Sequence, residues 1–595
     1  MTQILNRNIF ALTAILVFIY LIIRSITVPI SHDEAATFFH YIQSNKFVPY
    51  YTLWDANNHF LNSLLVYPLY KIFGSDLFWL RLPNLILFPL YALFAYKLTT
   101  EIKSNLVQLP TSIALITAPF LIEFFAQSRG YGLSFAFLLG AIYYINAFIK
   151  SKSPRHQLLI WVFIALTVMA NMSLMNTFLM ILGGIFLLLL FKGKKNFSRS
   201  NWVVFVMFGL IPFVFATIYA LDMKEMGLLY YGLGDGFVKV TVKSLFRFGF
   251  DTESMTLAWM ATIIGLIASV SLIAAFARKH FNFANAGMIA AVFLLGNALG
   301  SILLNFMMDV NFPEDRIAIY FLPLFILTFG YFVDHVSTKY RKFKWTVVLL
   351  VAFPISMLAQ LNLGYTLGWV IYPVSIDAYD YFNAEREKSD TPLIISGDRL
   401  LSMSWGYHNV RADIMGVPFA EDWRDTFHLS DYILCHPMNC VKTEADYDLV
   451  FEDESNMKIY KRKADLNLTP IFELDSTLYF NDDFEYHNIL DTYNDTVIRN
   501  ANILEVEIKV ASPNIPLNTE IIITSSNPTN NKLYYDIVPL KWIQNSWDGQ
   551  TLHFRRPVSL PAESERFVVY FWNIDKVQQE ITVINVRLYH GEVVE

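Results

Sequence analysis

Charged residues are scarce in this chain. Asp, Glu, Lys and Arg make up only 16% of its 595 residues, whereas 55% are hydrophobic and the mean hydropathy is +0.40. A soluble protein of this size would carry nearer a quarter charged residues, so the composition excludes that class and indicates a membrane protein. The chain also lacks a basic stripe, which argues against a nucleic-acid partner.

Cysteine is almost absent. The two that occur, Cys435 and Cys440, lie in "CHPMNC". They allow one small disulfide loop if this part of the chain is outside the cytoplasm, but two free thiols are an equally good interpretation. The first apolar run lacks an A-x-A-like cleavage site, so we expect a retained helix rather than a signal peptide.

The few charges are divided unevenly along the chain. Residues 1–375 hold 26 Lys+Arg and 15 Asp+Glu, a net of +11, whereas residues 376–595 hold 19 and 36, a net of −17, and the two sum to −6. This division predicts a polytopic membrane domain at 1–375 and an acidic extracytoplasmic tail.

Apolar runs of membrane-spanning length fill the first part. About 20 apolar residues cross a bilayer as a helix, and this criterion predicts eleven spans, near 9–30, 78–98, 108–124, 131–149, 157–172, 174–191, 202–221, 255–277, 284–306, 317–333 and 346–366. Basic loops alternate with acidic ones, and the positive-inside rule makes the basic loops cytoplasmic. An odd number of spans then places the tail outside, most simply in the periplasm of a cell with an inner membrane.

The sequence pattern of the tail divides it into two parts, residues 376–465 and 466–595. Short buried runs such as "DYILCHP" (431–437) predict a small α/β segment over 376–465. From 466 to 595, alternating runs separated by turn residues predict a β-sandwich. This sandwich is either a structural cap or a carbohydrate-binding surface. The second alternative depends on three tryptophans, Trp542, Trp547 and Trp572, although core burial explains such residues more often.

An acidic pair, Asp33 and Glu34, stands in "SITVPISHDEAATFFHY" directly after the first apolar run. The loop that it opens runs to about residue 77 and includes apolar stretches that predict helices lying in the membrane interface. Ionisable groups near a membrane are usually paired, solvated or functional. The pair is therefore a candidate functional site.

Four segments in order resemble a known family. They are "HDEA" after the first helix, "YKIFGSDLFWLRLPNLILF" (70–88), "AQSRGYGLSFAFLLGAIYYI" (126–145) and "EDRIAIYFLPLFIL" (314–327). Together they are similar to the GT-C fold glycosyltransferases that use polyprenyl-phosphate sugars, in particular the protein mannosyltransferase and aminoarabinose transferase family. The resemblance covers about residues 1–370, and the tail shows none.

The resemblance implies a reaction and the roles of its residues. A sugar would move from a polyprenyl phosphate to an acceptor at the outer face of the membrane, with inversion, and Asp33 would be the general base beside Glu34. The chain departs from the family at "NNHFLN" (57–62), where Asn58 and His59 replace a Lys or His followed by two prolines. His59 is a candidate for phosphate binding, for metal ligation, or for a hydrogen bond to a loop carbonyl.

Three arginines are candidates for the donor phosphate. Arg129 and Arg316 stand at the outer ends of predicted spans, and Arg247 lies in a long outer loop; guanidinium groups suit bidentate phosphate contacts. For each, an interfacial anchor or an internal ion pair is the alternative. No H-x-x-H or E-x-x-H spacing occurs, so no metal ligands are predicted, although a divalent cation stays an open alternative to arginine for the leaving phosphate.

The sequence therefore predicts a glycosyltransferase of the cell envelope. Its expected partners are membrane lipids, a polyprenyl-phosphate sugar donor, and a glycan, lipid or protein acceptor. The alternative is a transporter or flippase of lipid-linked glycans. Transporters usually show internal repeats and polar groups near the bilayer midplane, whereas the charges here gather at the outer ends of the spans.

Overall fold

The structure, a computed structural model, describes residues 2–229, 231–278, 285–412, 414–421, 427–440, 445–474, 476–529 and 531–594. The chain forms two compact units. The first contains residues 1–27 and 40–363, and the second contains residues 28–39 and 364–595. The segment that carries the acidic pair therefore belongs to the second unit. The sequence suggested a boundary near 375 and gave no sign that residues 28–39 belong to the second unit.

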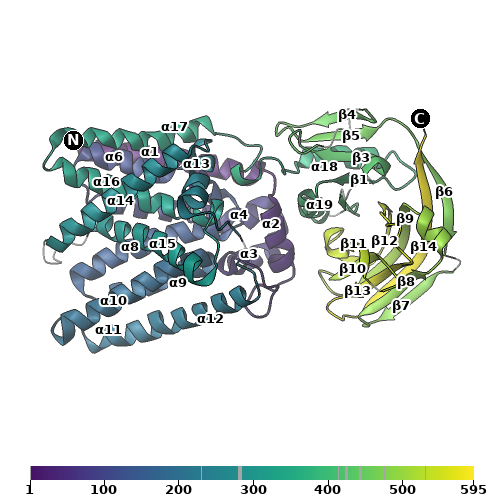
Figure 1. The fold of residues 1–595 in the computed structure, drawn as a ribbon, viewed down its shortest axis with the longest axis horizontal. Coiled ribbons are helices and arrows are strands. Elements are labelled where there is room, and N and C mark those ends of the chain that lie inside the picture. Colours follow the sequence, from purple (N-terminus) through teal and green to yellow (C-terminus); the bar gives the residue numbers. More distant parts are fainter. Residues whose placement is uncertain are drawn as a thin grey trace. The chain divides into compact units, whose positions relative to one another are not determined.

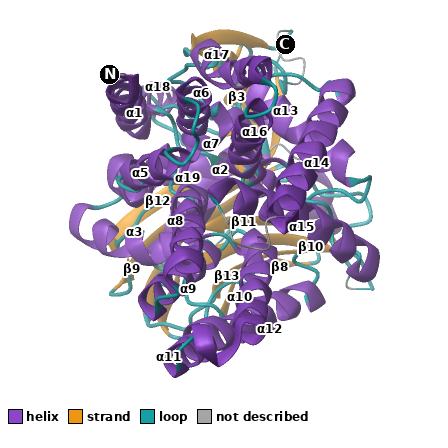
Figure 2. Cartoon of the chain, turned by 90° about the vertical axis from the view of Figure 1, so that its left-hand side faces the viewer, coloured by secondary structure: helices purple, strands orange, loops and turns teal. Residues whose placement is uncertain are grey.

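The first unit is helical (Figures 1 and 2). Its longer helices are α1 (Thr2–Thr27), α3 (Phe60–Phe73), α4 (Leu77–Leu85), α5 (Phe88–Thr99), α6 (Asn105–Thr117), α8 (Gly130–Ser151), α9 (Pro154–Ala170), α10 (Met175–Asn196), α12 (Ile211–Glu225), α13 (Lys243–Phe250), α14 (Met255–Arg278), α15 (Ala286–Met308), α16 (Phe321–Ser337) and α17 (Ala352–Ala359). Short helical turns join several of them, among them η5 (Val238–Val242) and η7 (Arg341–Val351).

The predicted spans all correspond to apolar helices. Among the described residues, nine helical segments are long and apolar enough to cross a membrane, or ten if one bent pair is a single span. That pair, Asn105–Thr117 and Pro119–Ala126, bends by 50° where Pro119 follows the extended Ala118. The remaining predicted span is α9, which has 17 residues because Pro154 begins it and Asn171 leaves the helical conformation.

Local signals fix where these helices begin and end. Asp76 accepts a hydrogen bond from the Phe78 amide and caps α4. Asn285 does the same for α15 through the Met288 amide. Gly74 ends α3 with a φ of +78°, which a residue without a Cβ adopts at little cost. The membrane helices are therefore delimited by ordinary capping chemistry.

The second unit contains every named strand of the described residues. Its α/β segment is a five-stranded sheet in the order β2-β1-β3-β5-β4, with α18 (Ile376–Arg386) and α19 (Arg399–Ala412) beside it. The strands are β1 (Ile395–Gly397), β2 (Ala420–Glu421), β3 (Tyr432–Cys435), β4 (Tyr447–Glu452) and β5 (Lys458–Arg462). Strand β1 runs parallel to both neighbours, whereas β5 pairs antiparallel with β3 and β4. A disulfide joins Cys435 and Cys440, the first of the two alternatives.

The rest of the tail is a sandwich of two sheets. One has the order β11-β10-β13-β8 and the other β12-β9-β14-β6, with β7 also on β14. The strands are β6 (Leu466–Glu473), β7 (Leu478–Asp482), β8 (Tyr486–Thr492), β9 (Ile503–Ser512), β10 (Thr519–Ser526), β11 (Lys532–Pro539), β12 (Trp547–Pro557), β13 (Arg566–Asn573) and β14 (Gln579–Val593). The predicted fold class, a helical membrane domain followed by β-rich segments, is confirmed.

The three tryptophans of the sandwich have different environments. Trp547 is buried in the core between the sheets, so its proposed place on a binding surface is wrong. The Trp542 ring lies 5.5 Å from that of Phe39 and is half-buried. Only Trp572 lies on an outer sheet face, half-buried beside Tyr486.

Candidate functional site

The acidic pair begins a short helix, α2 (His32–Thr37). Ser31 caps it, and the Glu34 side chain accepts a hydrogen bond from the Ser31 backbone N–H at 3.1 Å, which completes a capping box. Asp33 and Glu34 are both buried. Glu34 thus has a structural task at the helix start. Of the two predicted catalytic acids, Asp33 is the better candidate for proton transfer.

Contacts with α19 hold α2 in place within the second unit. His32 Nδ1 lies 3.0 Å from the Leu400 carbonyl oxygen, and the Ser404 hydroxyl donates to the Ile30 carbonyl at 3.4 Å. The Phe38 ring meets the Tyr407 ring edge-on at 5.5 Å between centroids. The acidic pair therefore has its position fixed by residues almost 370 positions later in the chain.

Arg129 lies at the start of α8 in the first unit. It is buried, and its guanidinium lies 5.7 Å from the centre of the Tyr131 ring. A buried arginine is costly unless charges or hydrogen bonds compensate it, and its planar guanidinium suits bidentate contacts with oxyanions such as phosphate. Phosphate binding by Arg129 stays a prediction.

A buried amide network fixes the turn around Arg129. Asn84 donates to Asn62 Oδ1 at 2.7 Å and accepts from the Leu133 amide at 3.1 Å. Asn62 donates in turn to the Ser128 carbonyl at 3.2 Å. Because all these polar groups lie in an apolar interior, removing one leaves its partners unsatisfied. The network is a positioning device for Arg129 that the sequence did not single out.

His59 lies beside the same turn. Its Nδ1 is 2.8 Å from the Ala170 carbonyl oxygen, and its ring is 4.8 Å from that of Tyr131. A Cβ at Gly130 would collide with the Ala170 carbonyl oxygen and lie 2.8 Å from His59 Nδ1, so only glycine fits there. The hydrogen bond to a carbonyl, one of the three roles left open for His59, is therefore present. Neighbouring Asn58 donates to the Phe47 carbonyl and shapes the loop.

The other two arginines form a second group. Arg247 pairs with Asp315 at 2.7 Å and lies 3.8 Å from Glu314, and burial beside Asp315 raises the pKa of Glu314 while Arg247 opposes the rise. Arg316 donates to the Tyr231 hydroxyl at 2.8 Å, and its guanidinium carbon lies 4.5 Å from the centre of the Tyr231 ring. Arg247 thus matches the ion-pair alternative, whereas Arg316 is held by an aromatic residue.

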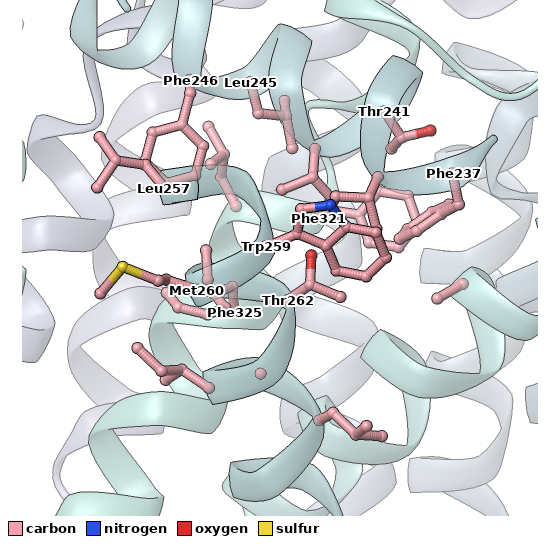
Figure 3. Close-up of a pocket in the computed structure, with 18 of the residues that line it drawn as sticks. Phe237, Thr241, Leu245, Phe246, Leu257, Trp259, Met260, Thr262, Phe321 and Phe325 are labelled. Atoms are coloured by element: carbon pink, nitrogen blue, oxygen red, sulfur yellow. The ribbon is translucent and has the colours of Figure 1, made fainter. Parts of the chain in front are cut away.

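A large apolar pocket lies within the first unit (Figure 3). Its volume is about 1150 Å³. Helices α14, α15 and α16, which pack side by side (Figure 1), form its walls. Part of its lining comes from the segment η5–α13 through Thr241, Leu245 and Phe246, and another part comes from η7 and α17. The volume exceeds the upper end of the usual range for small-molecule pockets, about 300–1,000 Å³.

Cationic side chains stand on the segment that lines this pocket. Lys239 pairs with Asp235 at 2.7 Å, Lys243 with Glu253 at 2.8 Å, and Arg247 with Asp315. The Lys243 ammonium holds the pKa of Glu253 below its usual value. An apolar pocket with such a segment beside it suits a ligand with a long hydrocarbon part and an anionic head.

Metal ligation has no candidate among the residues that the structure describes. No group of three or more His, Cys, Asp or Glu side chains lies together there. The glycine-rich "YGLGDGF" (231–237) is anchored by a bridge from Leu233 to Phe312 and by close packing of Gly232 on the Phe312 carbonyl.

Comparisons with known proteins give structural neighbours only. No family model and no curated protein matches the chain. The apo oligosaccharyltransferase of Archaeoglobus fulgidus superposes with a TM-score of 0.45 and 10% identity, covering 99% of this chain and 96% of that one. ArnT of Cupriavidus metallidurans bound to undecaprenyl phosphate gives a TM-score of 0.41 and 9% identity, and the match covers 76% of this chain and 97% of ArnT. Arabinosyltransferase EmbB of Mycobacterium smegmatis gives a TM-score of 0.41 and 9% identity. The match covers 98% of this chain, which spans only 64% of the length of EmbB. These are proteins of the class that the sequence motifs resemble.

Proposed function

We propose that this chain is an integral membrane glycosyltransferase that moves a sugar from a polyprenyl phosphate to an acceptor at the outer, periplasmic face of the membrane. The apolar pocket of about 1150 Å³ lined by η5–α13 carries the proposal. Each methylene buried there contributes about 0.8 kcal/mol, so its walls favour an isoprenoid tail. A lipid phosphate at its margin would compete for Lys239, Lys243 or Arg247, and solvent-exposed ion pairs are weak enough for a phosphate to displace.

The proposed chemistry is a direct displacement. The acceptor hydroxyl attacks the anomeric carbon, its proton goes to the Asp33 carboxylate, and the bond from that carbon to the phosphate oxygen breaks. The polyprenyl phosphate leaves with the bonding electrons, and Arg129 and Arg316 are assigned to its charge. One attack from the face opposite the leaving group inverts the anomeric centre. Glu34 keeps Asp33 in place through the cap of α2.

A transporter of lipid-linked glycans is the competing function. It would use the same pocket but would leave the sugar–phosphate bond intact. The buried Asp33 carboxylate and the buried Arg129 guanidinium favour chemistry, because ionisable groups are costly to bury and are kept where they are used. The two functions differ in whether polyprenyl phosphate is released.

The test is lipid mass spectrometry on cells with wild-type protein, Asp33→Asn, Asp55→Asn or no copy, at matched protein levels. Asp55 is a matched control because it is a carboxylate of the same predicted loop, and its side chain accepts a hydrogen bond from the Asn57 amide. We expect one polyprenyl-phosphate sugar to accumulate in the deletion and in Asp33→Asn, but not in Asp55→Asn. If Asp33→Asn has a wild-type profile while the deletion does not, the assignment of Asp33 is wrong and transport is favoured.

A further inference from the structure

The outer face of one sandwich sheet carries a group of aromatic side chains. The sheet β11-β10-β13-β8 buries its other face against the second sheet, for example through Phe571, Val569 and Ile523. The alternate residues of the same strands point outward. They include Tyr486 on β8, Tyr570 and Trp572 on β13, and Tyr535 on β11, and these four residues are called the aromatic face below.

The strand register brings these residues together. Trp572 lies opposite Tyr486 on one side and Glu520 on the other, and Tyr570 lies opposite Asn488 and Ile522. The Tyr486 ring is 6.3 Å from Trp572 at an interplanar angle of 18°, and 6.0 Å from Tyr570. Neighbouring strands are about 4.8 Å apart, so the rings cover several strands as one platform.

Exposure shows that the platform is accessible. Tyr486 is 54% exposed and Tyr535 40% exposed, while Tyr570 and Trp572 are half-buried. Between them, Ile522 is buried although it does not belong to the core of the sandwich. Exposed aromatic groups of this kind are uncommon on a surface with no binding role.

Polar groups are set among the rings. Glu520 on β10 is paired with Trp572 across the sheet, and Asn488 on β8 is paired with Tyr570. Burial raises the pKa of the Glu520 carboxyl, with Lys541 opposing the rise, so this group lies in a partly apolar environment. The acids at the margin are matched by cations, Asp491 by Arg566 and Glu485 by Lys576, each at 2.7 Å. The aromatic face is therefore charge-balanced rather than basic.

We propose that the aromatic face binds a glycan chain. The C–H groups on one side of a pyranose ring carry partial positive charge and pack on the negative face of an aromatic ring. The Glu520 carboxylate and the Asn488 amide supply the hydrogen-bond partners that sugar hydroxyls need. An anionic membrane surface would require an excess of Lys and Arg, which the balanced charges do not give. This inference does not depend on the proposed transfer reaction.

The test uses the full-length protein in lipid nanodiscs and four soluble probes: maltotetraose, cellotetraose, mannotetraose and chitotetraose. Binding is followed by calorimetry and by tryptophan fluorescence up to about 5 mM probe, a range suited to weak sites. We expect at least one tetrasaccharide to bind and Tyr486→Ala to weaken it about tenfold. Glu520→Gln should weaken it less. Tyr479→Ala is the matched control, because Tyr479 is equally exposed but lies on β7 of the other sheet.

Several outcomes would overturn the inference. One is that none of the four probes binds; another is that Tyr486→Ala and Tyr535→Ala both bind like wild type. Sedimentation with phosphatidylglycerol vesicles that depends on Tyr486 would assign the face to a lipid surface instead. Asp33→Asn protein is titrated in parallel: glycan binding by an inactive Asp33→Asn protein separates this site from the transfer site, so each proposal can fail alone.

Discussion

The two units offer different apolar surfaces. The pocket of the first unit is lined by aliphatic, phenylalanine and tryptophan side chains, many of them on α14, α15 and α16, and the segment η5–α13 that forms part of its lining carries cations. The aromatic face of the second unit is open, is made of tyrosine and tryptophan, and carries a carboxylate and an amide. An apolar pocket of this volume favours a flexible hydrocarbon chain, whereas flat rings with polar neighbours favour a sugar. We therefore propose that the two surfaces bind different parts of the reactants.

The charged groups differ between the units in the same way. The first unit contributes arginines suited to phosphate, and the second unit contributes Asp33 on a helix held by α19. The proposed division is a donor side in the first unit and an acceptor side in the second. If this division is correct, variants on one side should change the function of that side and leave the other side unchanged.

The largest effect is expected on the donor side, from Arg129→Gln. Loss of one buried donor to a developing anion typically lowers kcat by about 10²–10³-fold, and we expect a decrease of this size with the protein still folded. Arg155→Gln, an exposed arginine at the start of α9, is the control. Turnover of the purified enzyme checks the prediction. An equal loss in both variants, or none in Arg129→Gln, would contradict the assignment.

The second prediction concerns the stability of the acceptor side. Burial lowers the pKa of His408 on α19 to about 4, against a hydrogen bond with the Val374 carbonyl that opposes the shift. The imidazole of His408 binds a proton more readily in the unfolded chain than in the folded one. The free energy of unfolding is therefore highest above the unfolded pKa of about 6.5 and falls as the pH decreases towards 4. The loss amounts to about 3 kcal/mol.

Denaturant unfolding of the second unit, followed by tryptophan fluorescence from pH 7.5 to 4, measures this loss. His408→Asn should flatten the pH dependence, whereas His590→Asn, at an exposed position on β14, should not. A wild-type slope in His408→Asn would assign the acid sensitivity to other groups.

A smaller effect is expected from the disulfide. The bond closes a loop with a sequence separation of only 5, and loop-entropy arguments give about 2 kcal/mol for so short a loop. The double variant Cys435→Ser and Cys440→Ser should lower the unfolding free energy of the second unit by about this amount. Lipid binding to the first unit should not change. A change in donor binding would break the proposed division.

The smallest effect is expected from filling the pocket. Ala298 on α15 lines it, and Ala298→Phe should weaken binding of polyprenyl phosphate about tenfold, since it displaces about two methylenes. Val270→Phe is the control, because Val270 is exposed on α14 and outside the lining. Tetrasaccharide binding should be the same in both variants. Native mass spectrometry of nanodiscs gives the lipid occupancy.

The sequence predicted the helices and most strands because their periodicity is strong. "ILEVEIKV" and "RFVVYFW" became β9 and β13, and each predicted span became an apolar helix. Strands β2 and β5 to β8 were missed. Strand β2 has only two residues, and "KIYKR" and "LNLTPIFE" alternate poorly and are shaped by their neighbours in the sheet.

The candidate site was harder to predict. The motifs pointed to Asp33 and Arg129, but Asn62, Asn84 and Gly130 acquire their roles only through contacts between residues 22–71 positions apart. The attachment of α2 to α19 has no local signal either, because it joins His32 to Leu400. The register that gathers Tyr486, Tyr570 and Trp572 follows from strand pairing, which an aromatic count cannot show.

The central claim is that the sugar–phosphate bond is broken with Asp33 as the base. The most direct measurement is release of free polyprenyl phosphate, by ³¹P NMR, from purified protein in nanodiscs supplied with the polyprenyl-phosphate sugar that accumulates in the deletion strain and with an extract of its acceptors. The account predicts release by wild type and by Asp55→Asn, and none above background by Asp33→Asn. Passage of the intact lipid across the bilayer without any release of polyprenyl phosphate would contradict it.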